Sequence, residues 1–366
     1  MRIIFLVLIM LATSCAKNNP IALALHTNDA KIKQVFDGIE KYEVQILFTE
    51  VLEKKDTIIF KDHSFQVDDS TYFYPARSVK FPIAVLALEK LNKNPLINRN
   101  TIFTIEGDST RTTVANEIKK IFAVSDNEAY TRLFEYLGQD YITSELEKRG
   151  IVSRISHRFS GANPYSLETK SLHFYKNDSL IFSSESTKND TLKPLQLKRI
   201  TKGIGYTQGD SLIEKPMNFS LKNYMPISSL HNLMKLVQFP EIFPIEKRFE
   251  ISKEDSAFLL NMMKILPKQA NYISEEYYDS YVKFLVFGDT KEPIPNDIKI
   301  YNKVGYAYGY LTDCAFIENT KTNKKYIITA TIHVNNNRVF NDGVYEYDNI
   351  GIPFLAALGR QLIGYK

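Results

Sequence analysis

Strand-like segments lie near both ends of this chain, and helix-like segments fill the long stretch between them. Residues with alternating or continuous apolar patterns predict strands at 42–51, 57–67, 298–304, 310–318 and 326–334. Helical patterns occur at 78–91, 112–123, 127–137, 143–149, 228–237, 253–264 and 353–362. We therefore expect an α/β (α+β) fold, in which an antiparallel sheet built from both chain ends lies beside an all-α lobe.

The composition argues against several classes of binding partner. The 366 residues are 44% hydrophobic, enough for a large core, and the 22 Tyr and 23 Phe are assigned to strands and to that interior. The net charge of +4 and the lack of a Lys/Arg tract argue against nucleic acid as a partner. Six scattered histidines show no metal-ligand spacing, so we expect neither a metal nor a cofactor.

The N-terminus predicts export. Residues 1–15 carry one basic residue, an apolar run too short to span a bilayer, and then small residues, which is typical of a signal peptide. The ending Leu11-Ala12-Thr13-Ser14-Cys15 resembles a bacterial lipobox, with Ala12 where Leu is usual, so Cys15 is the expected lipidation site. The alternative is an ordinary signal peptide with an incidental cysteine. We expect a lipid-anchored protein of the bacterial cell envelope, on the periplasmic or surface side.

The domain prediction follows from these segments. Residues 16–34 are expected to form a tether and 35–366 one two-lobed domain. Its α/β lobe comprises 35–92 and 296–366, and its helical lobe comprises 93–295, with an insertion at 166–222.

Three short motifs fall at the ends of predicted elements. The first, Arg77-Ser78-Val79-Lys80, begins a helix, where residues three apart share a face and residues two apart do not. The second, Ser125-Asp126-Asn127, lies between two helices, but Ser125 and Glu128 also fit a capping box. The third, Lys303-Val304-Gly305, begins a strand, and alone it is equally well a strand with one exposed lysine.

In this order the motifs resemble the S-x-x-K, S-D-N and K-T-G elements of the class A β-lactamase and penicillin-binding-protein-like superfamily of bacterial serine hydrolases. The stretches 72–92, 303–313 and 344–360 are similar to it as well, and the insertion 166–222 is the least similar part. The resemblance implies a mixed α/β lobe and an all-α lobe with the active site between them.

The resemblance also implies roles for individual residues. Lys80 matches the general base, Ser125 the proton shuttle, Asn127 the holder of the substrate amide, and Lys303 the group that binds a substrate carboxylate. Gly305 would let the ligand approach the backbone.

Two further features of the family are less well matched. The backbone N–H groups of Arg77 and Tyr306 would fall at the oxyanion positions. The deacylating glutamate has no convincing match, and Glu168 is the nearest candidate.

The chain departs from the family at the nucleophile, because Arg77 occupies the serine position of S-x-x-K. A guanidinium stays protonated and has no lone pair with which to attack a carbonyl. Three hypotheses follow. The first is an acylation-deficient protein that binds small molecules or the carboxylates of cell-wall peptides. The second is an active hydrolase of β-lactams or D-Ala-D-Ala peptides that uses Ser78, and the third is a purely structural envelope lipoprotein.

Overall fold

The computed structural model describes residues 19–55 and 57–365. The predicted signal peptide and Cys15 lie outside the described residues. No helix in the described part of the chain combines the length and the apolar character that a membrane crossing requires.

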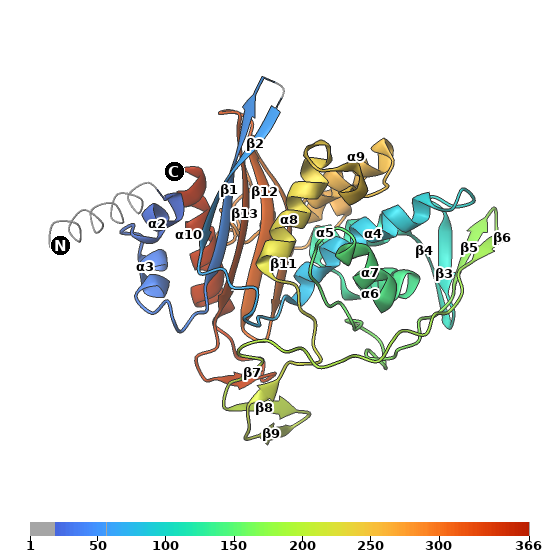
Figure 1. Ribbon diagram of the computed structural model, residues 1–366, viewed down its shortest axis with the longest axis horizontal. Coiled ribbons are helices and arrows are strands. Elements are labelled where there is room, and N and C mark those ends of the chain that lie inside the picture. The colour runs from blue at the N-terminus through green and yellow to red at the C-terminus, as the bar shows by residue number, and fades with distance from the viewer. Residues whose placement is uncertain (1–18, 56, 366) are drawn as a thin grey trace, which may run out of the picture.

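A five-stranded antiparallel sheet forms the centre of the α/β lobe (Figure 1). Its strand order is β11-β12-β13-β1-β2, so the first two strands of the chain pair with the last three long ones. The strands are β1 (Gln45–Lys54), β2 (Thr57–Phe65), β11 (Ile298–Ala307), β12 (Tyr310–Asn319) and β13 (Lys324–His333). The junction of the two chain ends is the β1–β13 pair, where Ile46 lies opposite Ala330. The sheet predicted from the two ends of the sequence is thus confirmed.

Helices cover both faces of this sheet. Helices α2 (Pro20–Leu25), α3 (Ala30–Phe36) and α10 (Ile352–Ile363) lie on one face, and α8 (Ile227–Gln238) lies on the other (Figure 1). The predicted tether 16–34 is wrong where it overlaps α2 and α3. Ile21 and Leu25, spaced i and i+4, are fully buried on one side of α2, and the Asn19 side chain caps this helix by accepting from Ile21 N.

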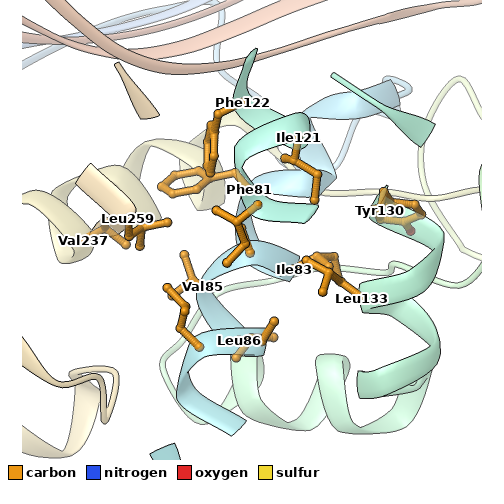
Figure 2. Packing of buried hydrophobic residues seen from close by; sticks show 14 of the residues in the cluster. Phe81, Ile83, Val85, Leu86, Ile121, Phe122, Tyr130, Leu133, Val237 and Leu259 are labelled. Atoms are coloured by element: carbon orange, nitrogen blue, oxygen red, sulfur yellow. The ribbon is translucent and has the colours of Figure 1, made fainter. Parts of the chain in front are cut away.

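The helical lobe is built around α4 (Lys80–Asn92), of which every residue from 80 to 89 is buried. Figure 2 shows its apolar side chains packed among others that include Ile121, Leu133, Val237 and Leu259. The other helices in this lobe are α5 (Val114–Val124), α6 (Asn127–Leu137), α7 (Gln139–Glu147) and α9 (Lys253–Met263). Burying each large apolar side chain stabilises the fold by about 1.5–3 kcal/mol, so α4 holds the lobe together.

Two details of the lobe prediction are corrected. The lobe is not all-α, because a four-stranded sheet in the order β4-β3-β5-β6 forms its far edge. These strands are β3 (Ile102–Ile105), β4 (Asp108–Thr113), β5 (Leu172–Lys176) and β6 (Ser179–Ser183). In addition, Val282–Phe287, placed in the helical lobe by the sequence, pack into the core of the five-stranded sheet. They do so because α10 comes close enough that a Cβ on Gly359 would lie 2.6 Å from Val286 N.

The rest of the insertion 166–222 crosses the lower end of the five-stranded sheet (Figure 1). It contains β7 (Thr201–Lys202), β8 (Gly205–Gln208), β9 (Ser211–Ile213) and β10 (Met217–Asn218). Strand β8 pairs in parallel with β14 (Val339–Phe340), and Ile204 N donates to Arg338 O at 2.9 Å. The insertion is therefore fastened to the segment that follows β13.

Candidate functional site

Arg77 and Lys80 lie one turn apart at the start of α4. The 3₁₀ helix η1 (Ala76–Val79) runs directly into α4, and Pro82 is tolerated because it falls in the first turn. Both side chains reach the same atom: Asn127 Oδ1 accepts from Arg77 Nε at 3.2 Å and from Lys80 Nζ at 2.8 Å. Position 77 is thus aligned with Lys80, as the motif spacing predicts.

Ser125 is not the helix cap that the sequence allowed as an alternative. Asp126 is the N-cap of α6, with its carboxylate accepting from Ala129 N at 2.8 Å. Ser125 instead ends α5 in the left-handed region, with φ of 57°. This conformation turns the serine out of the helix, and its hydroxyl accepts from Lys303 Nζ at 2.7 Å.

Lys80 and Lys303 are buried lysines held by fixed acceptors. Lys80 Nζ donates to Ser125 O, Asp126 O and Asn127 Oδ1 at 2.6, 2.8 and 2.8 Å, which uses all three ammonium protons. Lys303 Nζ donates to Ser125 Oγ and to Val304 O, both at 2.7 Å. We call Lys80, Ser125 and Lys303 the buried lysine cluster.

Burial and mutual repulsion shift both lysines in the same direction. Desolvation lowers the pKa of Lys80 well below its usual range, and Lys303 and Arg77 lower this pKa further. Desolvation likewise lowers the pKa of Lys303, with Arg77 as the next cause. Within residues 19–55 and 57–365, no carboxylate lies within 4.0 Å of the cationic group of Lys80, Lys303 or Arg77. The more distant carboxylates of Asp126 and Asp313 oppose these shifts only in part.

Strand β11 presses against η1 at Gly305. A Cβ on Gly305 would lie 2.5 Å from Pro75 O, 2.5 Å from Ser78 N and 2.9 Å from Arg77 N. The glycine is required for this close approach of two backbone segments, and the approach of a ligand to its backbone stays a prediction. As a result Arg77 and Tyr306, the two predicted oxyanion positions, lie side by side.

Arg77 is directed into the cleft between the lobes. Its guanidinium carbon lies 4.8 Å from the centre of the Tyr306 ring, a cation–π distance, and the side chain is half-buried. The preceding Ala76 has φ of 47°, a left-handed conformation that costs on the order of 1–3 kcal/mol in a non-glycine residue. Such strain is concentrated at ligand-binding and catalytic sites.

Ser78, the alternative nucleophile, does not line the cleft. Its side chain is fully buried, and its hydroxyl donates to Pro75 O at 2.6 Å. The residue lies two positions before Lys80, so it points to another side of the helix. In this arrangement the Ser78 hydroxyl is not exposed to the cleft, and its use as a nucleophile stays a prediction.

The cleft has a volume of about 600 Å³ and a wall made of aromatic side chains. Arg77, Asn127 and Tyr306 line it, whereas the buried lysine cluster lies behind this lining. The aromatic residues are Tyr74, His157, Phe159, Tyr165, Tyr306, Tyr308, Tyr345 and Tyr347. The sequence analysis missed this wall, because it assigned the numerous tyrosines to strands and to the core.

Among the described residues that line the cleft there is no aspartate or glutamate. Glu168 is exposed, lies outside the lining, and makes an isolated backbone bridge with Lys188. It therefore cannot act as a base at the cleft in this arrangement. Within the part of the chain that the structure describes, no group of three His, Cys, Asp or Glu residues is placed to hold a metal ion.

Comparison with solved structures finds the same fold in several hydrolases. A β-lactamase from Sphaerobacter thermophilus matches with a TM-score of 0.50 and 15% identity, covering 94% of this chain and 95% of that one. A β-lactamase from Xanthomonas campestris matches at 0.51 and 13%, covering 94% and 99%. A mutant of PBP-A in an acyl-enzyme complex with penicillin G matches at 0.50 and 11%, covering 91% and 94%.

No protein-family model and no curated protein sequence matches the chain. At these identities the structural matches establish the fold alone. The predicted β-lactamase/transpeptidase-like fold is thus confirmed, with an antiparallel sheet beside a mainly helical lobe.

Proposed function

We propose that this cleft binds anionic peptides that end in a carboxylate, such as those of the bacterial cell wall, without being acylated. The observation that carries the proposal is the position of Arg77. Its guanidinium hydrogen-bonds Asn127 and packs on Tyr306, where the resemblance places an attacking hydroxyl. Loss of the nucleophile in subtilisin reduces turnover by about a millionfold, so an arginine at this position leaves binding as the remaining role.

The electrostatics favour an anion. Arg77 Nε donates to Asn127, and the edge formed by the two Nη groups can bind a carboxylate in a bidentate manner. No protein carboxylate competes for it among the described residues. Arg77 is itself a permanent cation at the lining, because its guanidinium stays protonated. Aromatic rings on the opposite wall offer apolar surface to the rest of a peptide.

The test is calorimetry with a peptide ending in D-Ala-D-Ala, at low salt. The wild-type chain is expected to bind the peptide, and this binding should weaken as salt is raised. Arg77→Ala is expected to lower the affinity at least tenfold. Lys321→Ala is a matched control, because this exposed cation lies in the β12–β13 turn, at the opposite end of the strands from the cleft. Absence of heat with the wild-type chain, or an equal loss in the control, would contradict the proposal and favour a purely structural protein.

We further propose that the protein is anchored to a membrane of the cell envelope through a lipid on Cys15. The short apolar run that ends in Leu11-Ala12-Thr13-Ser14-Cys15 supports this. Metabolic labelling with an alkyne fatty acid should mark the wild-type chain and not Cys15→Ser. Equal labelling of both, or labelling of neither, would contradict lipidation at this residue.

A further inference from the structure

A second pocket lies at the lower end of the five-stranded sheet, where the insertion meets the segment after β13. Its volume is about 450 Å³, and none of its lining residues lines the cleft. We call it the basic pocket, because its lining includes four cationic residues, Lys41, Arg199, Lys202 and Arg338. Glu43 is the one carboxylate among the described lining residues.

The single carboxylate of this pocket is already paired. Glu43 accepts from Lys202 Nζ at 2.7 Å and lies 3.9 Å from Arg199. These cations hold the pKa of Glu43 below its usual range against the opposing effect of its burial. Lys41 and Arg338 have no carboxylate within 4.0 Å in the described chain, so two cations at the rim are free to bind an anion.

Two buried polar atoms in the same pocket have no partner among the described residues. They are His333 Nε2 and Asn335 Oδ1, and the Asn335 residue is only 7% exposed. Asn335 Nδ2 donates to Val339 O at 3.0 Å, which fixes the amide so that Oδ1 is an acceptor that requires a donor. Leaving such a buried acceptor without a donor is unfavourable. A bare oxyanion has no proton to give it, whereas a hydroxyl group does.

His333 supplies the second polar contact and part of an apolar wall. Its ring stacks between Tyr310 and Phe340, at centroid distances of 4.2 and 5.7 Å. Burial lowers the pKa of His333 to about 4, so at neutral pH the ring is uncharged. An uncharged imidazole can exchange a hydrogen bond with a hydroxyl without adding to the charge of the pocket.

From these features we infer that the basic pocket binds a sugar that carries a phosphate group, with the phosphate at Lys41 and Arg338 and hydroxyls at Asn335 and His333. The insertion 166–222 then has a function, because it supplies Arg199 and Lys202 and closes one side of the pocket. Its position is fixed by the close approach at Gly203, where a Cβ would lie 2.4 Å from Arg338 O.

The experiment is calorimetry of the full-length chain with three probes at low ionic strength: glucose 6-phosphate, glucose and inorganic phosphate. Glucose 6-phosphate should bind at least tenfold more tightly than phosphate, and glucose most weakly. The double variant Lys41→Gln/Arg338→Gln should lose at least tenfold in affinity for glucose 6-phosphate. The matched pair Lys321→Gln/Lys324→Gln, which removes two exposed cations at the other end of the sheet, should not.

A third variant tests the sugar contact. His333→Phe keeps the ring stack and removes Nε2, so it should reduce the affinity for glucose 6-phosphate towards that for phosphate. Since Lys41 and Arg338 are exposed, the charge variants can be measured even if the histidine variant does not fold. Equal affinity of the wild-type chain for phosphate and glucose 6-phosphate, no binding at millimolar concentration, or an equal loss in the control pair would overturn the inference.

Discussion

Lys80 and Lys303, behind the cleft, are held by hydrogen bonds to main-chain carbonyls and to Ser125, whereas Arg77, in front of them, is held by one amide oxygen and a tyrosine ring. The back of the site is buried, where Lys80 donates to three acceptors and Lys303 to two. The front is half-buried and its guanidinium keeps free N–H groups. The back therefore supports the fold whether or not any reaction takes place.

This difference shows which motif residues stabilise the fold and which one bears on chemistry at the cleft. In a buried network, removing one partner leaves another unsatisfied, so such residues are costly to replace. A half-buried side chain at the lining can change with little loss of stability. The presence of Lys80, Ser125, Asn127 and Lys303 is consequently weak support for catalysis, and the identity of residue 77 is the more informative observation.

The largest loss of stability is expected for a substitution at Gly305, where the two regions touch. In Gly305→Ala, the new Cβ meets Pro75 O and Ser78 N at 2.5 Å and forces β11 away from η1. Overpacking of this kind costs about 2–3 kcal/mol, and it should also weaken peptide binding by displacing Arg77 from Tyr306. Urea unfolding measures the cost. Gly38→Ala, where the nearest atom would lie at 3.5 Å, is the control and should change little.

Two substitutions with smaller effects on stability should distinguish the buried back of the site from its half-buried front. Ser125→Ala removes one of the two acceptors of the buried Lys303 ammonium, at a cost of about 1.5–2 kcal/mol. Arg77→Ala should change the free energy of unfolding by less than about 0.5 kcal/mol while abolishing peptide binding. Equal destabilisation by the two substitutions would remove the distinction between the regions.

Ser78→Ala tests the alternative nucleophile. Loss of the buried hydrogen bond to Pro75 O should cost about 1 kcal/mol, with peptide binding unchanged. A loss of covalent labelling by a fluorescent penicillin in this variant would instead restore Ser78 as an active residue.

The free energy of unfolding should depend on pH because Lys80, Lys303 and Arg77 lie close together. Because the pKa values of Lys80 and Lys303 are lower in the folded than in the unfolded chain, the unfolded chain binds more protons, and stability rises with pH up to the ordinary lysine pKa of about 10.4. Arg77→Ala removes one cause of both shifts, so the rise should shrink, by about 1 kcal/mol or less. The free energy of unfolding of both chains, measured between pH 7 and 10, tests this prediction. A steeper rise of stability with pH in Arg77→Ala would contradict the role of Arg77 in lowering the pKa values of the lysines.

The sequence predicted the sheet and most helices, because these depend on local patterns. That the three motifs meet was implied by their resemblance to the serine hydrolases. The prediction failed where a contact between residues far apart in the sequence determines the structure. Ile21 and Leu25 are buried because α10, β2 and α3 pack against α2, so a segment flanked by polar residues was taken for a tether. Ser125 fits a capping box by spacing, but the buried Lys303 determines where its hydroxyl lies. The aromatic wall of the cleft has no periodic signal, since its members come from separate segments of the chain.

Intact-mass spectrometry after incubation with penicillin G tests the central claim most directly, using the wild-type chain and Arg77→Ser. In Arg77→Ser a hydroxyl lies one turn before Lys80, with the buried lysine cluster unchanged. We expect no change in mass for the wild-type chain and the addition of one penicillin to the variant, hydrolysed slowly because no carboxylate lines the described cleft. An adduct of that mass on the wild-type chain would contradict the account.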